Sequence, residues 1–300
     1  MTIKRLKKYS PFYIMMFFPL LYFFIYRYIP MYGVTIAFKD YNVMKGIIGS
    51  PWAKPLGKHF KMFFDSPYFI QLLRNTLLIS FYKLAWGTFP PILLALLLNE
   101  VRFSWYKRII QTLSYMPHFL SWVIIQGILI AFLSEDMGLI NRAIREAGND
   151  TIPFLISTSW FRTLVVGSAV WRDMGWGAII YLAAISGISP DLYAAGTIDG
   201  CSKIQMMWHI TLPNIRYVII LLLILRLGRV MEAGFEQIYV MYNPHVYSVG
   251  DILDTWVYRT GLEQLNFSLA SAVGLFKSAI GFVLVVGTNQ LAKRWGENVW

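Results

Sequence analysis

The chain has 300 residues, of which 57% are hydrophobic and 14% are charged, and its formal net charge is +11. A soluble globular domain carries about 25% charged residues, so this composition argues against that class and indicates an integral membrane protein. The basic residues are scattered at the ends of apolar runs and form no stripe on a soluble face, so nucleic acid is not expected as a partner.

Six apolar runs are expected to span the membrane, whose hydrocarbon core is about 30 Å thick. In chain order they cover residues 12–28, 76–98, 113–133, 163–185, 217–235 and 268–291. The first run follows basic residues but lacks a small-residue cleavage site, so it is predicted to be a retained helix and not a signal peptide. Pro90 and Pro91 are expected to kink the second span.

The segments between the spans suggest how the chain is divided. Residues 1–30 comprise the N-terminal tail and the first span, and residues 31–75 form the longest loop, which Pro and Gly interrupt too often for a span. Residues 76–291 are predicted to form a five-helix core, followed by a tail at 292–300. A further exposed segment is expected between the fifth span and Asn266.

Lys and Arg indicate which side of the membrane each segment occupies. Six spans place both termini on one side, together with residues 99–111 and 186–216. These segments carry Lys and Arg at a higher density than the opposite loops, which is typical of the cytoplasmic side. We therefore expect a multi-pass protein of the cell membrane with both termini in the cytoplasm and residues 31–75 outside.

A polar interruption at residues 190–213 stands between the fourth and fifth spans. Pro190 and Asp191 suit the first turn of a short helix, because Pro has no amide hydrogen to lose and a carboxylate favours the positive end of the helix dipole. Gly200 is predicted to break this helix, and helical spacing of apolar residues predicts a second one from Lys203, which Pro213 terminates or restarts.

This interruption resembles the EAA loop of permease subunits from binding-protein-dependent ABC importers. The resemblance rests on Ala195, Asp199, Gly200, Ile210, Leu212 and Pro213. The chain departs from the motif at the Glu-Ala-Ala triplet, where it has Ala194, Ala195 and Gly196. In that family the loop is the cytoplasmic element that couples the permease to its ATPase, so the resemblance implies this role for residues 190–213.

Other segments resemble the carbohydrate-type permeases of such importers, particularly their LplB-like branch. They are SYMPHFLSWV at 114–123, IIYLAAISGISPDLY at 179–193, GFEQIYVMYNP at 234–244, DILDTWVYRTGL at 251–262 and the run at 273–300. The resemblance implies an all-α membrane protein with six transmembrane helices and the type I ABC importer permease fold. It implies a subunit that forms half of the translocation pathway for an oligosaccharide and works by alternating access.

The same resemblance implies the partners. They are a second homologous permease subunit, two ATPase subunits or domains, an extracellular solute-binding protein and the lipid bilayer. ATP and magnesium are then expected on the partner ATPase, with no cofactor on this chain.

No motif in the chain predicts catalysis or metal binding. Residues 196–203 read GTIDGCSK, which fails the spacing of a phosphate-binding loop. The four histidines, His118 among them, lack metal-ligand spacing and are interpreted as lone polar residues, and the single cysteine, Cys201, excludes a cysteine-rich metal site. The chain is therefore not expected to be an enzyme.

Charges within the fifth span are candidate residues of a substrate path. Arg226 lies some nine residues into this span, and Arg229 and Glu232 follow at three-residue intervals. A charge at the centre of a bilayer helix costs roughly 2.5–3.5 kcal/mol, so these side chains are expected to face protein or water. The series is either a neutralised structural stripe or part of a water-filled path for a polar solute.

A second candidate cluster lies in the fourth span and consists of Trp171, Arg172, Asp173 and Trp176. Arg172 and Trp176 are four residues apart, so the cation is able to stack on the ring. Aromatic faces beside charged groups suit sugars, and they also suit ordinary helix packing. If both arginine sites line one path, an excess of positive charge would favour an acidic, polysaccharide-derived oligosaccharide.

Two other functions stay open at this stage. A membrane enzyme acting on lipid-linked sugars could use Asp173, or Asp251 with Asp254, as acid or base. An ion-coupled transporter working alone is also compatible with charges inside the membrane, but it would leave a cytoplasmic glycine-elbow loop without a purpose.

Overall fold

The computed structural model describes residues 3–228 and 230–294, and this part of the chain folds into helices, turns and one isolated bridge without a β-strand. Four of its helices are long and apolar enough to cross a membrane, or six if each of two bent helix pairs counts as one span. The expected all-helical membrane fold is therefore confirmed. The backbone divides into two compact units, residues 1–66 with 257–276 and residues 67–256 with 277–300.

The first unit begins with one long apolar helix. It consists of α1 (Ile3–Phe23), a π-helical turn (Phe24–Tyr28), α2 (Ile29–Met31) and a 3-10 turn (Tyr32–Phe38). The apolar part covers Tyr9–Phe38 and so extends beyond the predicted end at residue 28. In the π-helical turn the Ile29 N–H bonds to the Phe24 carbonyl, and this wider turn carries the helix past Pro30.

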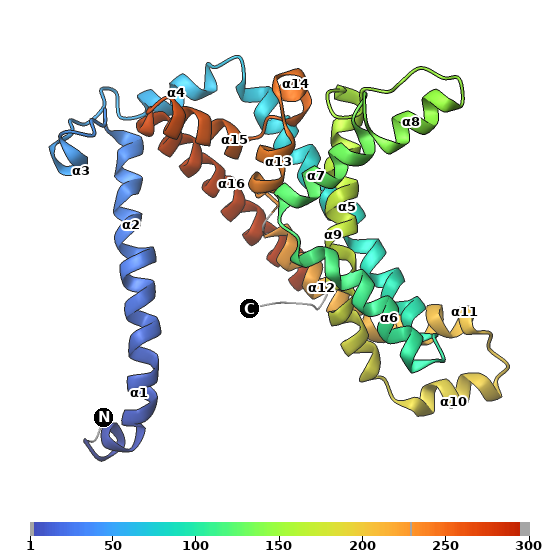
Figure 1. Cartoon of the computed structure of the whole chain (residues 1–300). Coiled ribbons are helices and arrows are strands. Elements are labelled where there is room, and N and C mark those ends of the chain that lie inside the picture. Colours follow the sequence, from blue (N-terminus) through green and yellow to red (C-terminus); the bar gives the residue numbers. More distant parts are fainter. Residues whose placement is uncertain (1–2, 229, 295–300) are drawn as a thin grey trace. The chain divides into compact units, whose positions relative to one another are not determined.

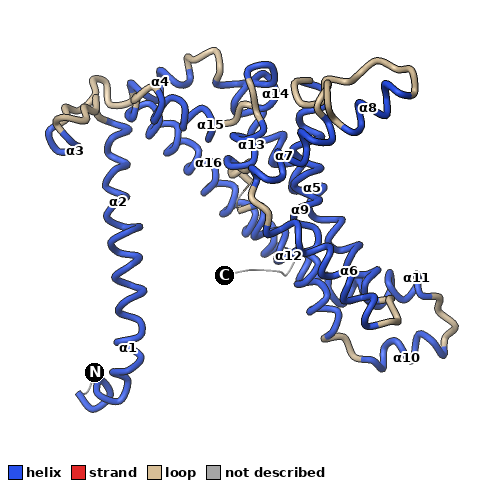
Figure 2. Tube along the Cα trace, in the orientation of Figure 1, coloured by secondary structure: helices blue, strands red, loops and turns tan. Residues whose placement is uncertain are grey.

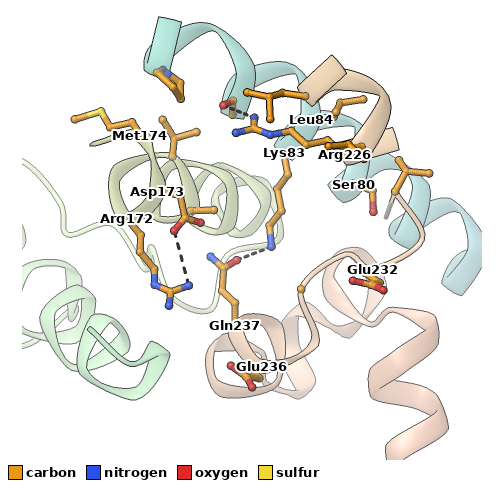
Figure 3. Close-up of a pocket in the computed structure, with 18 of the residues that line it drawn as sticks. Ser80, Lys83, Leu84, Arg172, Asp173, Met174, Arg226, Glu232, Glu236 and Gln237 are labelled. Carbon is orange, nitrogen blue, oxygen red and sulfur yellow. Dashed lines mark hydrogen bonds and ion pairs between the residues drawn. The ribbon is translucent and has the colours of Figure 1, made fainter. Parts of the chain in front are cut away.

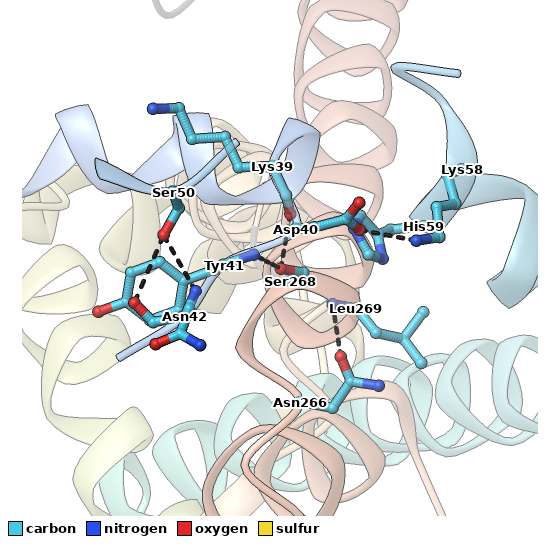
Figure 4. A network of polar contacts seen from close by, with 10 residues as sticks. All are labelled: Lys39, Asp40, Tyr41, Asn42, Ser50, Lys58, His59, Asn266, Ser268 and Leu269. Atoms are coloured by element: carbon cyan, nitrogen blue, oxygen red, sulfur yellow. Dashed lines mark hydrogen bonds and ion pairs between the residues drawn. The ribbon is translucent and has the colours of Figure 1, made fainter. Parts of the chain in front are cut away.

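The segment after this helix is folded, although the sequence suggested an extended loop. It contains α3 (Gly46–Gly49) and α4 (Lys58–Phe64), and in the same unit a π-helical turn (Arg259–Glu263) precedes the start of α16 (Phe267–Arg294). The Ser268 hydroxyl accepts a hydrogen bond from the Tyr41 N–H at 3.0 Å and donates one to the Lys39 carbonyl at 2.7 Å (Figure 4). These bonds join segments more than 200 residues apart in sequence.

A carboxylate in the same network is held by a neighbouring lysine. The Lys58 ammonium lies 2.8 Å from the Asp40 carboxylate, and His59 Nε2 lies 3.2 Å from the same oxygen (Figure 4). The hydrogen bond from Lys58 is the main reason that the pKa of Asp40 is lowered below its ordinary value, and burial opposes this shift. Asp40 is therefore ionised at neutral pH.

The second unit is built around α5 (Phe69–Asn99), α9 (Thr158–Ser186) and α12 (Leu212–Leu227). α5 begins seven residues before the predicted span, and it runs through Pro90 and Pro91 as one helix. The three helices meet in a buried cluster. Its members are Ile92 and Ala95 from α5, Ala178, Tyr181 and Ile185 from α9, and Ile215 from α12. Figure 1 shows α10 (Pro190–Ile198) and α11 (Lys203–Met206) beyond one end of α9, and α8 (Leu139–Glu146) beyond the other.

The third predicted span is wrong as a single helix. Residues 113–133 are divided between α6 (Ser104–Tyr115), a 3-10 turn (Met116–Phe119) and α7 (Trp122–Leu133), and the two arms meet at 105°. Leu120 takes an extended conformation, and Ser121 starts the new helix by accepting a bond from the Ile124 N–H at 3.3 Å. Hydropathy does not detect this bend, because the residues on both sides of it, the end of α6 and all of α7, belong to one apolar run.

The fifth predicted span is displaced along the chain. The helix runs from Lys203 to Leu227 and therefore ends eight residues before residue 235, and Gly234 in the following loop has a φ of +92°. Arg226 consequently lies in the last turn of this helix. Glu232 lies outside the helix, so the expected three-residue series does not form, and Arg229 is outside the described residues.

The segment before Asn266 is also more buried than expected. It contains α13 (Phe235–Met241), a 3-10 turn (Pro244–Val246), α14 (Tyr247–Gly250) and α15 (Leu253–Tyr258). Ile238 and Ile252 in this segment are fully buried against Ile79 and Phe161 from the long helices. Figure 2 shows how short the loops are that connect these helices. The sixth predicted span corresponds closely to α16.

Candidate functional site

A polar cavity of about 930 Å³ lies within the second unit, between α5, α7, α9, α12 and residues 230–237 (Figure 3). Its charged lining residues are Lys83, Arg172, Asp173, Arg226, Glu232 and Glu236. The cavity thus brings together Arg172, Asp173 and Arg226, which the sequence proposed for a substrate path. Trp171 and Trp176 are not among the residues that line it.

Lys83 on α5 holds the loop that follows α12. Its ammonium donates to the Ala233 carbonyl at 2.7 Å and to Gln237 Oε1 at 2.5 Å, as Figure 3 shows for Gln237. Gln237 is itself fixed, because its amide donates to the Val165 carbonyl of α9 at 2.7 Å. A Cβ atom at Gly234 would lie 2.6 Å from the Lys83 ammonium, so glycine lets the lysine approach. The predicted substrate path did not include Lys83, because a lone lysine in an apolar run was interpreted as snorkelling to the membrane surface.

Arg226 on α12 bonds to the backbone of α5. One guanidinium N–H donates to the Gly87 carbonyl at 2.6 Å. In an α-helix this carbonyl accepts from the N–H four residues later, and that residue is Pro91, which has none. Gly177 on α9 makes room for the contact, since a Cβ there would lie 3.1 Å from Pro91 and 3.6 Å from the guanidinium. Arg226 therefore donates to the Gly87 carbonyl, which Pro91 leaves without a donor within α5.

Arg172 on α9 stacks on an aromatic ring, but on a different one from that expected. Its guanidinium lies 4.5 Å from the centre of the Trp122 ring on α7, so the predicted pairing with Trp176 is replaced. A nitrogen of the same guanidinium lies 4.0 Å from the Asp173 carboxylate (Figure 3). The sequence did not indicate Trp122, because the bend between α6 and α7 brings it to the cavity.

His118, expected to be a lone polar residue, has two partners. Its Nδ1 lies 2.9 Å from the Asp173 carboxylate, and its ring stacks on Trp176 with centroids 4.7 Å apart and planes at 3°. This ring covers one face of Trp176. The pair lies at the bend between α6 and α7 and connects this bend to α9.

Charges of both signs line the cavity. Among the described lining residues, three cations face three carboxylates, so the expected excess of positive charge is not present in formal charge. The cations nevertheless bond mainly to neutral groups: Lys83 to a carbonyl and an amide, and Arg226 to a carbonyl. Glu232 and Glu236 both lie on the short segment that follows α12.

The predicted coupling loop forms two helices around a glycine elbow. α10 (Pro190–Ile198) begins at Ser189, and Gly200 has a φ of +75°, which favours glycine. α11 (Lys203–Met206) begins with a capping box between Ser202 and Gln205. A π-helical turn (Met207–Thr211) then continues into α12, so Pro213 neither ends nor restarts the helix. Pro213 lies just after the π-helical turn, inside the helix that continues from Lys203 to Leu227.

The loop has one packed face and one exposed face. On the packed face, Gly196 approaches Ile210, and a Cβ there would lie 3.0 Å from the isoleucine. On the exposed face, Leu192, Ala195 and Ile198 follow one another at three-residue spacing. Asp199, Gly200 and Pro213 are also exposed, and Leu212 is half-buried.

The loop is also connected to the end of α5. The ammonium of Lys203 lies 3.0 Å from the carboxylate of Glu100, which follows the last residue of α5. Both side chains are partly exposed, so this ion pair contributes little to stability.

Comparisons with known proteins agree with this architecture. Residues 87–296 match the family described as "Binding-protein-dependent transport system inner membrane component". The chain is 48% identical over 277 residues to the polygalacturonan/rhamnogalacturonan transport system permease protein YteP of Bacillus subtilis, which covers 92% of this chain and 86% of that protein. It is 46% identical to Protein LplB of the same organism, over 93% of this chain and 87% of that protein.

A solved structure is similar over nearly the whole chain. It is a chain of a bacterial ABC transporter involved in the import of the acidic polysaccharide alginate. The two chains share 37% identity with a TM-score of 0.89, over 97% of this chain and 98% of that chain.

Proposed function

The chain belongs to the family of binding-protein-dependent transport system inner membrane components, and from this premise we propose that its cavity lies on the import path of an oligosaccharide that carries carboxylate groups. It is a membrane permease with the type I ABC importer fold, and its relatives are transport proteins and not enzymes. The alternatives of a membrane enzyme and of a transporter working alone are thereby set aside.

The observation that carries the proposal is the bonding of the cavity's cations. Lys83 and Arg226 donate to carbonyl and amide oxygens, and Arg172 lies over an aromatic ring. A charged side chain near the centre of the bilayer raises the free energy of insertion by roughly 2.5–3.5 kcal/mol. This cost is reduced where the charge contacts an opposite charge or water. A cargo carboxylate would supply the opposite charge to these groups in a partly water-excluded site, where the attraction is stronger than in bulk water.

The cargo of two relatives supports the same class. The permease YteP is named for polygalacturonan and rhamnogalacturonan, and the transporter with the similar structure imports alginate. Galacturonan and alginate are both polymers of uronic acids, with a carboxylate on each sugar ring. Oligosaccharides of such polymers combine charge with apolar ring faces, which matches a cavity that contains Trp122 beside Arg172.

The assembly that we propose follows the family. This chain would pair with a second homologous permease and with two ATPase subunits or domains, and it would receive cargo from an extracellular solute-binding protein. ATP and magnesium would bind on the ATPase. The exposed apolar stripe of α10 fits a contact with that ATPase, and residues 190–213 and both termini would then lie in the cytoplasm.

The cargo class is tested in proteoliposomes that hold the complete importer and its binding protein. Uptake of trigalacturonate is compared with uptake of its fully methylated ester, which keeps the size of the sugar and removes the charge. Preferential uptake of the acid, with the preference lost in Lys83→Met and kept in Lys83→Arg, is the expected result. Lys45→Met, which removes an exposed lysine outside the cavity, is the matched control. Equal uptake of acid and ester would refute the proposed cargo.

The orientation is tested with the only thiol of the chain. Cys201 follows the glycine elbow, and a membrane-impermeant maleimide is expected to label it from the cytoplasmic face only. Bound ATPase is expected to slow this labelling. Labelling from the outside would contradict both the topology and the coupling role of the loop.

A further inference from the structure

One continuous helix connects the coupling loop to the cavity. It runs from Lys203 to Leu227, 25 residues, and at 1.5 Å per residue this corresponds to roughly 37 Å. Its first residues belong to the loop after Gly200, and its last turn carries Arg226 in the cavity lining. We refer to this helix, residues 203–227, as the rod.

α10 is fastened to the loop end of the rod. The Tyr193 hydroxyl of α10 lies 3.0 Å from the Thr211 hydroxyl of the rod, and Gly196 packs against Ile210. A force applied to α10 is therefore passed to the rod through a hydrogen bond and a close apolar contact.

The rod is held at its middle by the buried cluster described above. Ile215 is fully buried there against α5 and α9, and it stands about midway between Lys203 and Arg226 in sequence. Leu212, Val218, Ile219 and Leu222 of the rod pack against the same cluster, and Ile224 is also buried. Tightly packed apolar contacts resist separation, so a displacement of the loop end is carried along the rod to Arg226.

The cavity end of the rod is tied to α5 by a single directed bond. Arg226 donates to the Gly87 carbonyl at 2.6 Å, and Pro91 leaves that carbonyl without its intrahelical donor. When Arg226 moves away, a partly buried backbone acceptor loses its partner. The contact therefore favours one discrete position of the rod against α5.

We propose that the hydrogen bond between Arg226 and the Gly87 carbonyl is a latch that couples the position of the coupling loop to the occupancy of the cavity. The proposal rests on the proposed function, because it requires an ATPase that acts on α10. In this mechanism the Arg226 guanidinium contacts either the Gly87 carbonyl or the cargo. A change at the loop breaks the latch and frees the guanidinium for the cavity, and cargo that draws the guanidinium into the cavity releases the rod.

Two variants break the latch from opposite sides. Arg226→Met removes the donor, and Pro91→Ala supplies an N–H within α5 to the Gly87 carbonyl while keeping the Cβ that packs near Gly177. Each is expected to reduce the ratio of cargo-stimulated to basal ATP hydrolysis by about tenfold, a factor in the range for one hydrogen bond to a charged group. The double variant is expected to be no worse than Arg226→Met alone, since both changes act on the same interaction: one removes the donor, and the other adds an N–H that competes with it for the Gly87 carbonyl.

The experiment uses the assembled importer with binding protein loaded with trigalacturonate. Pro90→Ala is the matched control, because it restores a donor to the Trp86 carbonyl and leaves the Gly87 carbonyl for Arg226. It is expected to remain coupled, and Arg226→Lys is expected to recover part of the ratio. A merely structural role for Arg226 predicts instead that Pro91→Ala, which improves the helix, stays fully coupled.

The outcomes separate the latch from the function on which it rests. Reduced stimulation in both latch variants, with normal assembly and a coupled Pro90→Ala control, supports the latch. Full stimulation in either latch variant overturns it, while the permease role stands. A wild-type importer whose ATP hydrolysis does not respond to loaded binding protein refutes the proposed function and the latch with it.

Discussion

The contact between α6 and α9 gives the sharpest test of the structure, through the substitution Gly175→Ala. Gly175 is buried in α9, and a Cβ on it would lie 2.0 Å from the Ser114 carbonyl oxygen and 2.4 Å from its carbon. Ordinary contact requires 3.4 Å or more. The obstacle is backbone and not a mobile side-chain end, so α6 and α9 must separate.

The expected effect follows from two opposing terms. Alanine is better than glycine inside a helix by about 1 kcal/mol. Overpacking costs about 1–3 kcal/mol, and a clash with backbone belongs at the upper end of that range. We expect a net destabilisation of about 2 kcal/mol. Because His118 follows α6 directly, its contact with Asp173 should also be displaced, and cargo-stimulated ATP hydrolysis should fall with stability.

The assay is thermal unfolding of the purified importer in detergent, followed by intrinsic tryptophan fluorescence. Gly167→Ala is the matched control, because Gly167 lies on the same helix and a Cβ there meets nothing within 4 Å. The control should be as stable as the wild type or more so. If Gly175→Ala unfolds at the same temperature as Gly167→Ala, the close packing of α6 on α9 is refuted.

Three further predictions concern other parts of the chain. Lys277→Met should destabilise by about 1–3 kcal/mol, because it leaves the partly buried Asp254 carboxylate without the ammonium that lies 2.5 Å away; thermal unfolding measures this. Asn141→Ala should destabilise the α8 (Leu139–Glu146) hairpin by about 1–3 kcal/mol, because the fully buried amide makes four hydrogen bonds to backbone; proteolysis of residues 134–157 reports it. The ion pair of Asp40 and Lys58 should stabilise the fold above the pKa of about 3.9 that an aspartate has in the unfolded chain. This stabilisation should be lost as the pH falls through the lower pKa of Asp40 in the folded protein. Asp40→Asn should show no such loss in a pH series of melting temperatures.

Each of these predictions has a defined contrary result. An Asn141→Ala chain no more sensitive to protease than Asn149→Ala, which changes an exposed residue of the same hairpin, would contradict the role of the buried amide. A Lys277→Met importer with an unchanged melting temperature would show that the ion pair contributes nothing net. For Asp40, melting temperatures of wild type and Asp40→Asn that fall in parallel as the pH is lowered would show that the carboxylate does not contribute to the stability of the first unit.

Local patterns were sufficient for several features. The Gly200 elbow was predicted from sequence, and its φ of +75° is a conformation that residues with a Cβ rarely adopt. The start of α10 at Pro190 and the extent of α16 were predicted for the same kind of reason, since first-turn preferences and long apolar runs depend on neighbouring residues.

Features that depend on backbone direction were not predictable in this way. The apolar run at 113–133 reads as one span, because a hydropathy average is the same for a straight helix and for two arms at 105°. The end of the fifth helix at Leu227 was missed for a similar reason, because Met231 and Ala233 beyond it are apolar and bury their side chains in the fold instead of in lipid.

The sequence by itself determined the class of the protein, the approximate place of most of its apolar helices, and the loop that marks its family, because composition, hydrophobic runs and glycine or proline positions are properties of neighbouring residues. Tertiary structure alone decided which groups the charged and polar side chains contact. His118 reaches Asp173 across 55 residues, Arg226 reaches Gly87 across 139, and Lys83 reaches Ala233 across 150. Such partners are chosen by how the helices pack, and no periodicity along the chain encodes them.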